Sequence, residues 1–375
     1  MRKRILIVGA GPGGIAAVRR LRDRADSRLE LLLITREGVS EFLPGTIATV
    51  LGEAPAAHWR RPVRLRGVQV LAADVQQASG EGVVLTDGRT LEADAVIAAP
   101  GLHLDLQAVP PHPRRFVFWS PSTAEAARQA IARLEAGHLV VVISGLPYRC
   151  PPAPYSLALQ LAAFYRSRQR DVQLTLTTPE EAPLTGLGPE VTDFLLQACA
   201  AAGVAVQVRR TPDWSASTED TLVFTDGSRL SYDLALIVPP HTRAPLLDSL
   251  GDNGVLVSVN EQGETTVPGL FVVGDATRTL LPRTAGVATA QGLTAADAVL
   301  DRLGLARYEG PHLPAPECYI GHGNGRYSRI TIRFPEGLPP AGRPVIQLEG
   351  PSPELADGFA RVFAEWQALR TENGR

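Results

Sequence analysis

Residues 4–15 read Arg-Ile-Leu-Ile-Val-Gly-Ala-Gly-Pro-Gly-Gly-Ile, and this stretch decides the fold. An apolar run typical of a buried strand leads into glycines at positions 9, 11 and 14, and a helical segment follows. In this pattern Gly9 permits a tight turn, Gly11 lets the backbone approach a pyrophosphate, and Gly14 lets the helix pack closely on the strand. The helix amino terminus then donates hydrogen bonds to the phosphates. The stretch therefore predicts a dinucleotide-binding site.

The rest of the chain alternates between short apolar runs and alanine- and arginine-rich segments. The apolar runs predict strands at Arg4–Val8, Leu29–Ile34, Val68–Leu71, Ala95–Ala99, Leu139–Ile143, Val172–Thr177, Val204–Val208, Leu234–Val238 and Leu270–Val273. The intervening segments predict helices at about 13–24, 122–136, 154–168, 188–202 and 287–303. This alternation is typical of βαβ units around a parallel sheet. We therefore expect an α/β protein with two Rossmann-like dinucleotide-binding domains, and hairpin turns at Asp87-Gly88 and Asp226-Gly227.

Proline-rich linkers divide the chain into three parts. Pro110, Pro111 and Pro113 mark one linker, and the chain returns to the first domain around Pro239-Pro-His241. We expect a discontinuous first domain over 1–113 and 230–304, a second Rossmann-like domain over 114–229, and a C-terminal segment over 305–375. The C-terminal segment contains a predicted hairpin at Asn324-Gly325 and a final amphipathic helix. That helix is either a face that packs on the protein or a peripheral membrane contact.

Composition excludes several classes of protein. The chain has 375 residues, of which 45% are hydrophobic and 20% charged, as in a globular protein and unlike a disordered one. Its net charge of −2 gives no electrostatic footprint for nucleic acid. The apolar runs are too short to span a bilayer, and the amino terminus does not resemble a signal peptide. We expect a cytoplasmic protein, and the sequence predicts no metal site and no particular oligomeric state.

Two further segments extend the predicted dinucleotide site. The second expected strand ends at Thr35, where an acidic residue often binds the ribose, and Arg36 follows it. We expect Thr35 to hydrogen-bond a ribose hydroxyl, with Glu37 two residues away, and we expect Arg36 to bind the cofactor. The stretch 266–277 is a strand that ends in Gly274-Asp275, so that a carboxylate lies beside the cofactor. The helix that begins near Gly286 and Val287 then points its positive end at the same ligand.

These motifs, together with Ala98-Ala-Pro-Gly101, resemble those of the flavoproteins with two dinucleotide-binding domains, the disulfide reductase superfamily. The resemblance implies FAD as the cofactor. It assigns to Asp275 the ribityl hydroxyls, and to the helix at Gly286 the pyrimidine edge of the flavin. Members that use NAD(P)H carry a second glycine fingerprint. Here the corresponding strand is followed by Ser144-Gly-Leu-Pro-Tyr-Arg-Cys150, which lacks it. We therefore expect NADH and NADPH to reduce the flavin poorly.

Cys150 lies where the second glycine fingerprint of NAD(P)H-dependent members would be. Because Cys150 precedes the expected helix of 154–168, the helix dipole favours its thiolate, which predicts a lowered pKa. The third cysteine of the chain, Cys199, falls in a helical apolar segment and is expected to be a small core residue.

The segment Pro147-Tyr-Arg-Cys-Pro-Pro-Ala-Pro-Tyr155 is similar to the cysteine loop of sulfide:quinone oxidoreductases and of the flavoprotein subunit of flavocytochrome c sulfide dehydrogenase. Phe42-Leu-Pro44 and Pro239-Pro-His241 resemble segments of the same family. The resemblance implies that Cys150 and Cys318 form a redox pair beside the flavin. It also implies that Pro44 lies at the cofactor and that Arg283 stands where relatives have a lysine. Where relatives often have a glutamate acid/base this chain has Ser156, and His241 or His322 would have to replace it.

Four readings follow from the resemblance. The first is an FAD-dependent enzyme that oxidises sulfide, or a related sulfur compound, and passes electrons to a quinone, in the cytoplasm or peripherally on the cytoplasmic face of the membrane. The second replaces the quinone with a cytochrome. The third is an NADH dehydrogenase-like flavoenzyme, and the fourth is a flavin-binding sensor that has lost turnover.

Overall fold

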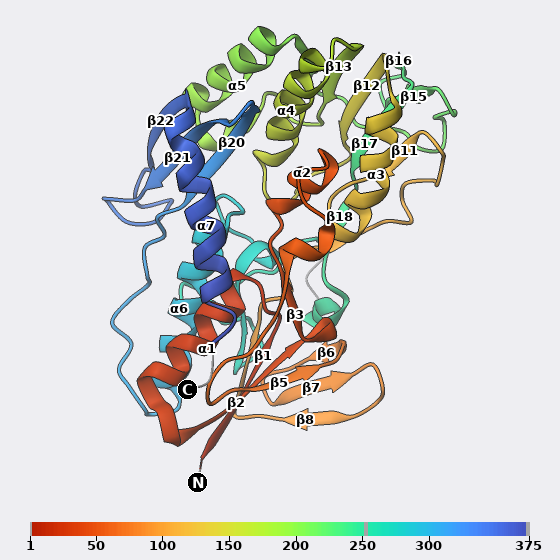
Figure 1. The fold of residues 1–375 in the computed structure, drawn as a ribbon. Coiled ribbons are helices and arrows are strands. Elements are labelled where there is room, and N and C mark those ends of the chain that lie inside the picture. Colours follow the sequence, from red (N-terminus) through yellow and green to blue (C-terminus); the bar gives the residue numbers. More distant parts are fainter. Residues whose placement is uncertain (1, 251–253, 373–375) are drawn as a thin grey trace.

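Two five-stranded parallel sheets organise the chain, so the predicted α/β class with two Rossmann-like units is confirmed (Figure 1). The computed structural model describes residues 2–250 and 254–372. The first sheet has the order β19-β9-β1-β2-β5 and consists of β1 (Lys3–Val8), β2 (Leu29–Thr35), β5 (Gln69–Ala72), β9 (Ala95–Ala98) and β19 (Leu270–Val272). The second has the order β11-β17-β12-β13-β14 and consists of β11 (Arg115–Val117), β12 (Ala136–Ile143), β13 (Asp171–Thr177), β14 (Val204–Gln207) and β17 (Leu234–Val238).

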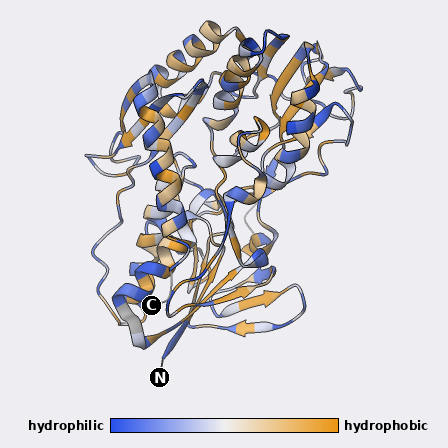
Figure 2. Ribbon diagram, viewed as in Figure 1, coloured by the Kyte–Doolittle hydropathy of each residue, from blue (hydrophilic) through white to orange (hydrophobic). Residues whose placement is uncertain are grey.

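The first sheet is covered on both faces, because its central strands are apolar at every position. Ile5 and Ile7 of β1 pack against helices α1 (Pro12–Ala25) and α6 (Ala285–Arg302). Leu6 and Val8 point to the other face, where a small antiparallel sheet packs. That sheet consists of β6 (Val75–Ala78), β7 (Gly82–Leu85) and β8 (Thr90–Glu92), and its β7–β8 turn is the predicted Asp87-Gly88 hairpin. In Figure 2 the strands of both parallel sheets are coloured mainly as hydrophobic.

The second sheet is covered in the same way. Leu139, Val141 and Ile143 of β12 pack against helices on one face, and Val140 and Val142 pack against a hairpin on the other. The helices are α3 (Pro121–Arg133), α4 (Ala153–Ser167) and α5 (Pro189–Ala202). The hairpin consists of β15 (Thr221–Val223) and β16 (Arg229–Ser231), joined at the predicted Asp226-Gly227 turn. Cys199 on α5 is fully buried in this core, as the apolar segment predicted.

Two of the segments that run between the two sheets pair with each other. Strand β10 (His103–Leu104) pairs antiparallel with β18 (His241–Thr242). One boundary of the expected first domain has to move, because β17 pairs with β11 and β12 in the second sheet. The return to the first domain therefore lies at about Pro239, after β17, and not at residue 230. With that change the three-part division is our proposal.

The C-terminal segment bridges both units. Strands β20 (Glu317–Gly323), β21 (Arg326–Arg333) and β22 (Val345–Ser352) form an antiparallel sheet, and β20 packs against α4. The predicted turn at Asn324-Gly325 joins β20 to β21 with both residues in the left-handed region. Helix α7 (Ala356–Ala368) then runs back towards α1 (Figure 1). The remaining short elements are β3 (Val39–Glu41), β4 (Arg60–Pro62) and α2 (Gly45–Val50). Within residues 2–250 and 254–372, no helix has both the length and the apolar character that a bilayer crossing requires.

Candidate functional site

A cavity of about 1520 Å³ reaches the carboxyl end of β1, the cysteine loop, β20 and α7. It exceeds the roughly 300–1,000 Å³ usual for a small-molecule site, and so has room for a dinucleotide and a second ligand. Most of the residues that the sequence singles out line it: Gly9, Gly11, Thr35, Arg36, Pro44, Gly101, Cys150, Gly274, Asp275, Arg283 and Cys318. Gly14, Gly286 and Val287 are not among the lining residues.

The glycine loop has the shape that a pyrophosphate requires. Gly9 adopts a φ of +101°, and a Cβ there would lie 2.3 Å from the carbonyl oxygen of Ala99, so only glycine fits the turn. A Cβ on Gly14 would lie 1.9 Å from the carbonyl oxygen of Gly9, which explains the close approach of α1 to the strand. At Gly11 a Cβ would meet nothing within 4 Å and would project into the cavity. The loop thus leaves open the space that the phosphates would fill.

Gly286 and Val287 lie at the start of α6, next to residues that line the cavity. Thr284 caps α6 by accepting a hydrogen bond from the backbone N–H of Val287 at 3.2 Å. A Cβ on Gly286 would lie 2.8 Å from Cα of Pro316, so Gly286 lets the C-terminal segment pass close to the helix. Contact of Gly286 and Val287 with the cofactor stays a prediction.

Thr35 and Arg36, the cofactor contacts expected after β2, line the cavity. The Thr35 hydroxyl is buried and donates to the carbonyl oxygen of Val39 at 3.1 Å, which leaves its lone pairs able to accept. Arg36 is exposed, and its Nε donates to a carboxylate oxygen of Asp74 at 2.9 Å. Glu37 also lines the cavity and forms an ion pair with Arg60.

Three charged side chains that line the cavity are half-buried, namely Asp275, Arg149 and Arg283. Asp275 follows β19, and its burial raises the pKa of the carboxyl, although the positive charges of Arg149 and Arg283 act in the opposite direction. Burial also lowers the pKa of both arginines, and Nε of Arg283 has no hydrogen-bond partner among the described residues. Arg149 donates through Nη2 to the carbonyl oxygen of Trp119 at 2.9 Å. Half-buried groups of both signs, Asp275 and Arg149, therefore act on Cys150.

The two predicted redox cysteines reach the same cavity from different parts of the fold. Cys150 lies in the loop after β12, with a φ of +53°, and its carbonyl oxygen accepts a hydrogen bond from the N–H of Ala153 at 3.0 Å. Cys318 lies on β20, opposite Ile330 of β21. Both are half-buried free thiols.

The expected low pKa of Cys150 is wrong. Burial raises the pKa of its thiol to about 11, and the carboxylate of Asp275 raises it further, whereas Arg149 lowers it. Burial also raises the pKa of Cys318 to about 12, with an additional contribution from Cys150. Desolvation of the thiolate therefore outweighs the helix dipole on which the sequence-based expectation rested.

Ser156 has a structural role that the sequence does not reveal. It is 3% exposed, and its hydroxyl oxygen accepts hydrogen bonds from the N–H of Gly321 at 2.9 Å and from Nε2 of Gln160 at 3.2 Å. A Cβ on Gly321 would lie 2.5 Å from the Gln160 side chain, so β20 lies tightly on α4. Ser156 thereby fixes the strand that carries Cys318 to the helix that follows Cys150.

Neither candidate histidine lines the cavity. His241 is 4% exposed, its Nδ1 lies 2.9 Å from the carbonyl oxygen of Pro239, and burial lowers its pKa to about 3. Nε2 of His322 lies 2.8 Å from the hydroxyl of Ser328, and burial lowers its pKa as well. Their geometry does not support the suggestion that one of them replaces the missing glutamate.

A wall of aromatic side chains closes the cavity under α7. Trp366 is 7% exposed and packs with Phe42 and Trp59, at ring-centroid distances of 5.4 Å for Trp366–Phe42 and 6.0 Å for Phe42–Trp59. Phe359 and Phe363 of α7 extend the same cluster. The apolar stripe of the final helix is therefore a packing face, and peripheral contact of the protein with a membrane stays a prediction.

At the crevice of the second Rossmann unit, side chains of the protein hydrogen-bond to one another. At the carboxyl ends of β12 and β13, where parallel sheets bind nucleotides, Tyr148 and Tyr155 donate hydrogen bonds to Oε2 of Glu180 at 3.3 and 2.8 Å. Thr178 donates to the same oxygen at 3.0 Å. Burial raises the pKa of the Glu180 carboxyl. The hydroxyl groups of these side chains already donate to Glu180, so they are not free to bind a second nucleotide.

Comparison with known proteins assigns this arrangement to a family. The profile of the pyridine nucleotide-disulphide oxidoreductases matches residues 3–292. The solved sulfide:quinone oxidoreductase of Aquifex aeolicus is similar with a TM-score of 0.82 and 18% identity, over 98% of this chain and 91% of that one.

Two further solved structures share the fold. A chain of the Tetrahymena thermophila mitochondrial ATP synthase gives a TM-score of 0.74 and 14% identity, over 98% of this chain and 93% of that one. Putidaredoxin reductase, in covalent complex with putidaredoxin, gives 0.69 and 18%, over 99% and 96%. At such identities these likenesses show the fold alone.

Proposed function

Because the chain belongs to the pyridine nucleotide-disulphide oxidoreductase family, we propose that it oxidises sulfide, or a related small sulfur compound, and passes the electrons to a quinone. It is an FAD-dependent redox enzyme, as the motifs predicted, and its glycine loop has the space that this cofactor needs. The proposal concerns which compound donates the electrons and which accepts them.

One observation carries the proposal. Cys150 and Cys318, which come from segments far apart in the sequence, line one cavity together with the glycine loop and Asp275. The electrostatic effect of Cys150 on the pKa of Cys318 supports their proximity. A core thiol such as Cys199, by contrast, lies outside the cavity and packs among apolar side chains.

The residues present suit sulfur chemistry. In the oxidised enzyme sulfide would attack one sulfur of a Cys150–Cys318 bond, so that one cysteine becomes a persulfide and the other leaves as a thiolate. When bound, FAD supplies the two-electron acceptor that connects the cysteines to a quinone. The positive charges of Arg149 and Arg283 offset the negative charge that collects near Asp275. Overall, sulfide loses two electrons, and the quinone gains two electrons and two protons.

The aromatic wall supports a quinone as the acceptor. Phe42, Trp59, Phe359 and Trp366 all line the cavity, and flat aromatic rings bind a quinone ring by stacking and by excluding water. We place the enzyme in the cytoplasm, where it would meet the membrane peripherally to reach this acceptor.

Anaerobic titration of the FAD-loaded enzyme tests the proposal. Sulfide should bleach the flavin absorbance, and a water-soluble quinone should restore it. NADH and NADPH should do little, because the turn 144–150 lacks the second glycine fingerprint and Tyr148, Tyr155 and Glu180 are engaged in hydrogen bonds with one another. Cys150→Ser and Cys318→Ser should each abolish the bleaching by sulfide and retain FAD, and Cys199→Ser is the matched control. Bleaching by NADH would favour the NADH dehydrogenase-like alternative, and reoxidation by a cytochrome but not by a quinone would favour the cytochrome alternative. No response to any donor would favour the sensor.

A further inference from the structure

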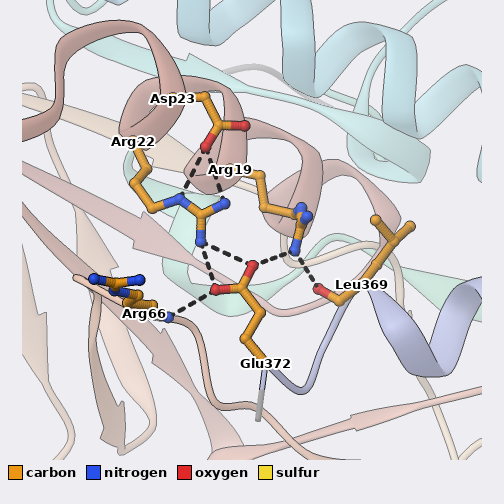
Figure 3. Close-up of polar contacts among 6 residues, drawn as sticks. All are labelled: Arg19, Arg22, Asp23, Arg66, Leu369 and Glu372. Atoms are coloured by element: carbon orange, nitrogen blue, oxygen red, sulfur yellow. Dashed lines mark hydrogen bonds and ion pairs between the residues drawn. The ribbon is translucent and has the colours of Figure 1, made fainter. Parts of the chain in front are cut away.

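The last described residues of the chain are fastened to the first domain. The N–H of Arg64 donates to the carbonyl oxygen of Arg370 at 2.8 Å, and the N–H of Glu372 donates back to Arg64 at 2.9 Å. The Glu372 carboxylate also accepts hydrogen bonds from Nη1 of Arg19 at 2.6 Å and from Nη1 of Arg22 at 2.8 Å (Figure 3). Arg19 and Arg22 belong to α1, the helix that follows the glycine loop, so the C-terminal tail is held beside the dinucleotide site.

Within this tail the guanidinium of Arg370 is buried and held by contacts with its neighbours. It is 2% exposed, and its Cζ lies 4.7 Å from the ring centroid of Trp366. Its Nε donates to the hydroxyl of Ser40 at 2.8 Å, and its Nη1 donates to the carbonyl oxygen of Trp366 at 2.8 Å. These partners are neutral, and among the described residues no carboxylate pairs with the guanidinium. A buried charge without a counterion is costly to the folded state.

The other arginines of the cavity do not share this property. Those that form an ion pair with a carboxylate are Arg19, Arg20, Arg36 and Arg60. Arg149 and Arg283 both feel the negative charge of Asp275. For Arg370, burial alone acts on the pKa and lowers it to about 9. Of the described arginines in the cavity lining, Arg370 is thus the buried one that no acidic side chain compensates.

The position of Arg370 indicates which anion would compensate it. Arg370 and its partner Ser40 both line the cavity. The Ser40 hydroxyl donates to the carbonyl oxygen of Ala10 at 2.7 Å, and Ala10 stands between the two glycines of the phosphate-binding turn. A single hydrogen-bonded residue therefore separates the guanidinium from the loop on which a dinucleotide places its pyrophosphate.

We propose that Arg370 binds the pyrophosphate of FAD, so that the C-terminal tail forms part of the cofactor site. The pyrophosphate brings two negative charges to a guanidinium that has no counterion among the described residues. Nε and Nη1 of Arg370 already donate to Ser40 and Trp366, so Nη2 is the group that would donate a charge-assisted hydrogen bond to a phosphate oxygen. The hydrogen bonds of Glu372 with Arg19 and Arg22 then hold Arg370 in place. This proposal does not depend on which substrate the enzyme oxidises.

The test compares FAD affinity with the stability of the apoprotein. Arg370→Met keeps an apolar stem against Trp366 and removes the charge. It should weaken FAD binding by about ten- to a hundredfold, the usual effect of losing a charge-assisted contact. Its apoprotein should melt no lower than the wild-type apoprotein, because an uncompensated buried charge is gone, whereas the rise in melting temperature on adding FAD should shrink. Arg370→Lys should recover part of the affinity, and the ³¹P resonances of its bound FAD should shift relative to wild type.

Arg361→Met is the matched control, because it removes the charge of an exposed arginine of α7 that does not line the cavity. It should bind FAD within about threefold of wild type by the same affinity scale. If Arg370→Met binds FAD as tightly as wild type while apoprotein and holoprotein lose stability equally, Arg370 only fastens the tail and the proposal fails. Unchanged ³¹P resonances in Arg370→Lys would also overturn it, since the charge would then lie away from the phosphates.

Discussion

Alanine at Gly11 should separate cofactor binding from folding. A Cβ at this position would touch no protein atom within 4 Å, and the φ of Gly11 lies outside the left-handed region. The substitution should therefore change the free energy of unfolding of the apoprotein by no more than about 1 kcal/mol. The same Cβ projects into the cavity at the phosphate-binding turn. FAD affinity should fall at least about tenfold, which corresponds to roughly 1.4 kcal/mol.

Alanine at Gly14 gives the matched contrast. Its Cβ would lie 1.9 Å from the carbonyl oxygen of Gly9, and that oxygen and the Cα bearing the Cβ both belong to the backbone. We expect a loss of about 3 kcal/mol or more in the free energy of unfolding, whether or not FAD is present. Urea unfolding of the apoproteins and fluorescence titration with FAD measure the two quantities. An apoprotein of Gly11→Ala that binds FAD with wild-type affinity would refute the placement of the pyrophosphate at this turn.

Three further predictions concern Ser156, Cys150 and Trp366. Ser156→Ala should lower the free energy of unfolding by about 1–3 kcal/mol, because the buried N–H of Gly321 loses its acceptor; a urea midpoint equal to wild type would contradict this role. Iodoacetamide should alkylate Cys150 of the apoprotein slowly at pH 7, and the rate should rise about tenfold per pH unit towards pH 11, because only the thiolate reacts and the pKa is raised to about 11; a rate that levels off near pH 7 would show a lowered pKa instead. Trp366→Ala should cost about 3 kcal/mol in stability, because it empties a buried site beside Phe42, and should raise the KM for a quinone; a lower KM would exclude the aromatic wall as the acceptor site.

Sequence patterns predicted the parallel sheets because their strands carry the required information locally. Ile5 to Val8 are apolar on both faces of the sheet. The glycines that follow meet local requirements as well, because Gly9 has a positive φ and a Cβ on Gly14 would collide with the carbonyl oxygen of Gly9. Strand β22 was not predicted, because Gly350 and Pro351 interrupt its alternation and its position depends on pairing with β21. The boundary placed at residue 230 was wrong because a strand's sheet is decided by its neighbours, and no local pattern shows that β17 pairs with β12.

The site was predictable as far as motifs reach. Glycine turns and the Gly274-Asp275 strand end are local signals, and the residues they name line the cavity. The pKa of Cys150 was predicted with the wrong sign, because burial depends on segments remote in sequence, such as β20. Ser156 and Arg370 carry no motif at all. Their surroundings come from partners 165 and 330 residues away, and only the folded chain brings these together.

Peptide mapping of the oxidised protein tests most directly whether Cys150 and Cys318 act as one redox pair. Trypsin releases Cys150 on the peptide 150–166 and Cys318 on the peptide 308–326. After mild oxidation of the FAD-loaded enzyme and digestion without reductant, mass spectrometry should find these two peptides joined, directly or through additional sulfur atoms. Reduction should release both, and the peptide with Cys199 should remain a free thiol throughout. If both cysteines remain separate and open to alkylation after the enzyme has been oxidised in the absence of sulfide, they are not a redox pair, and the sulfide chemistry proposed for this cavity is wrong.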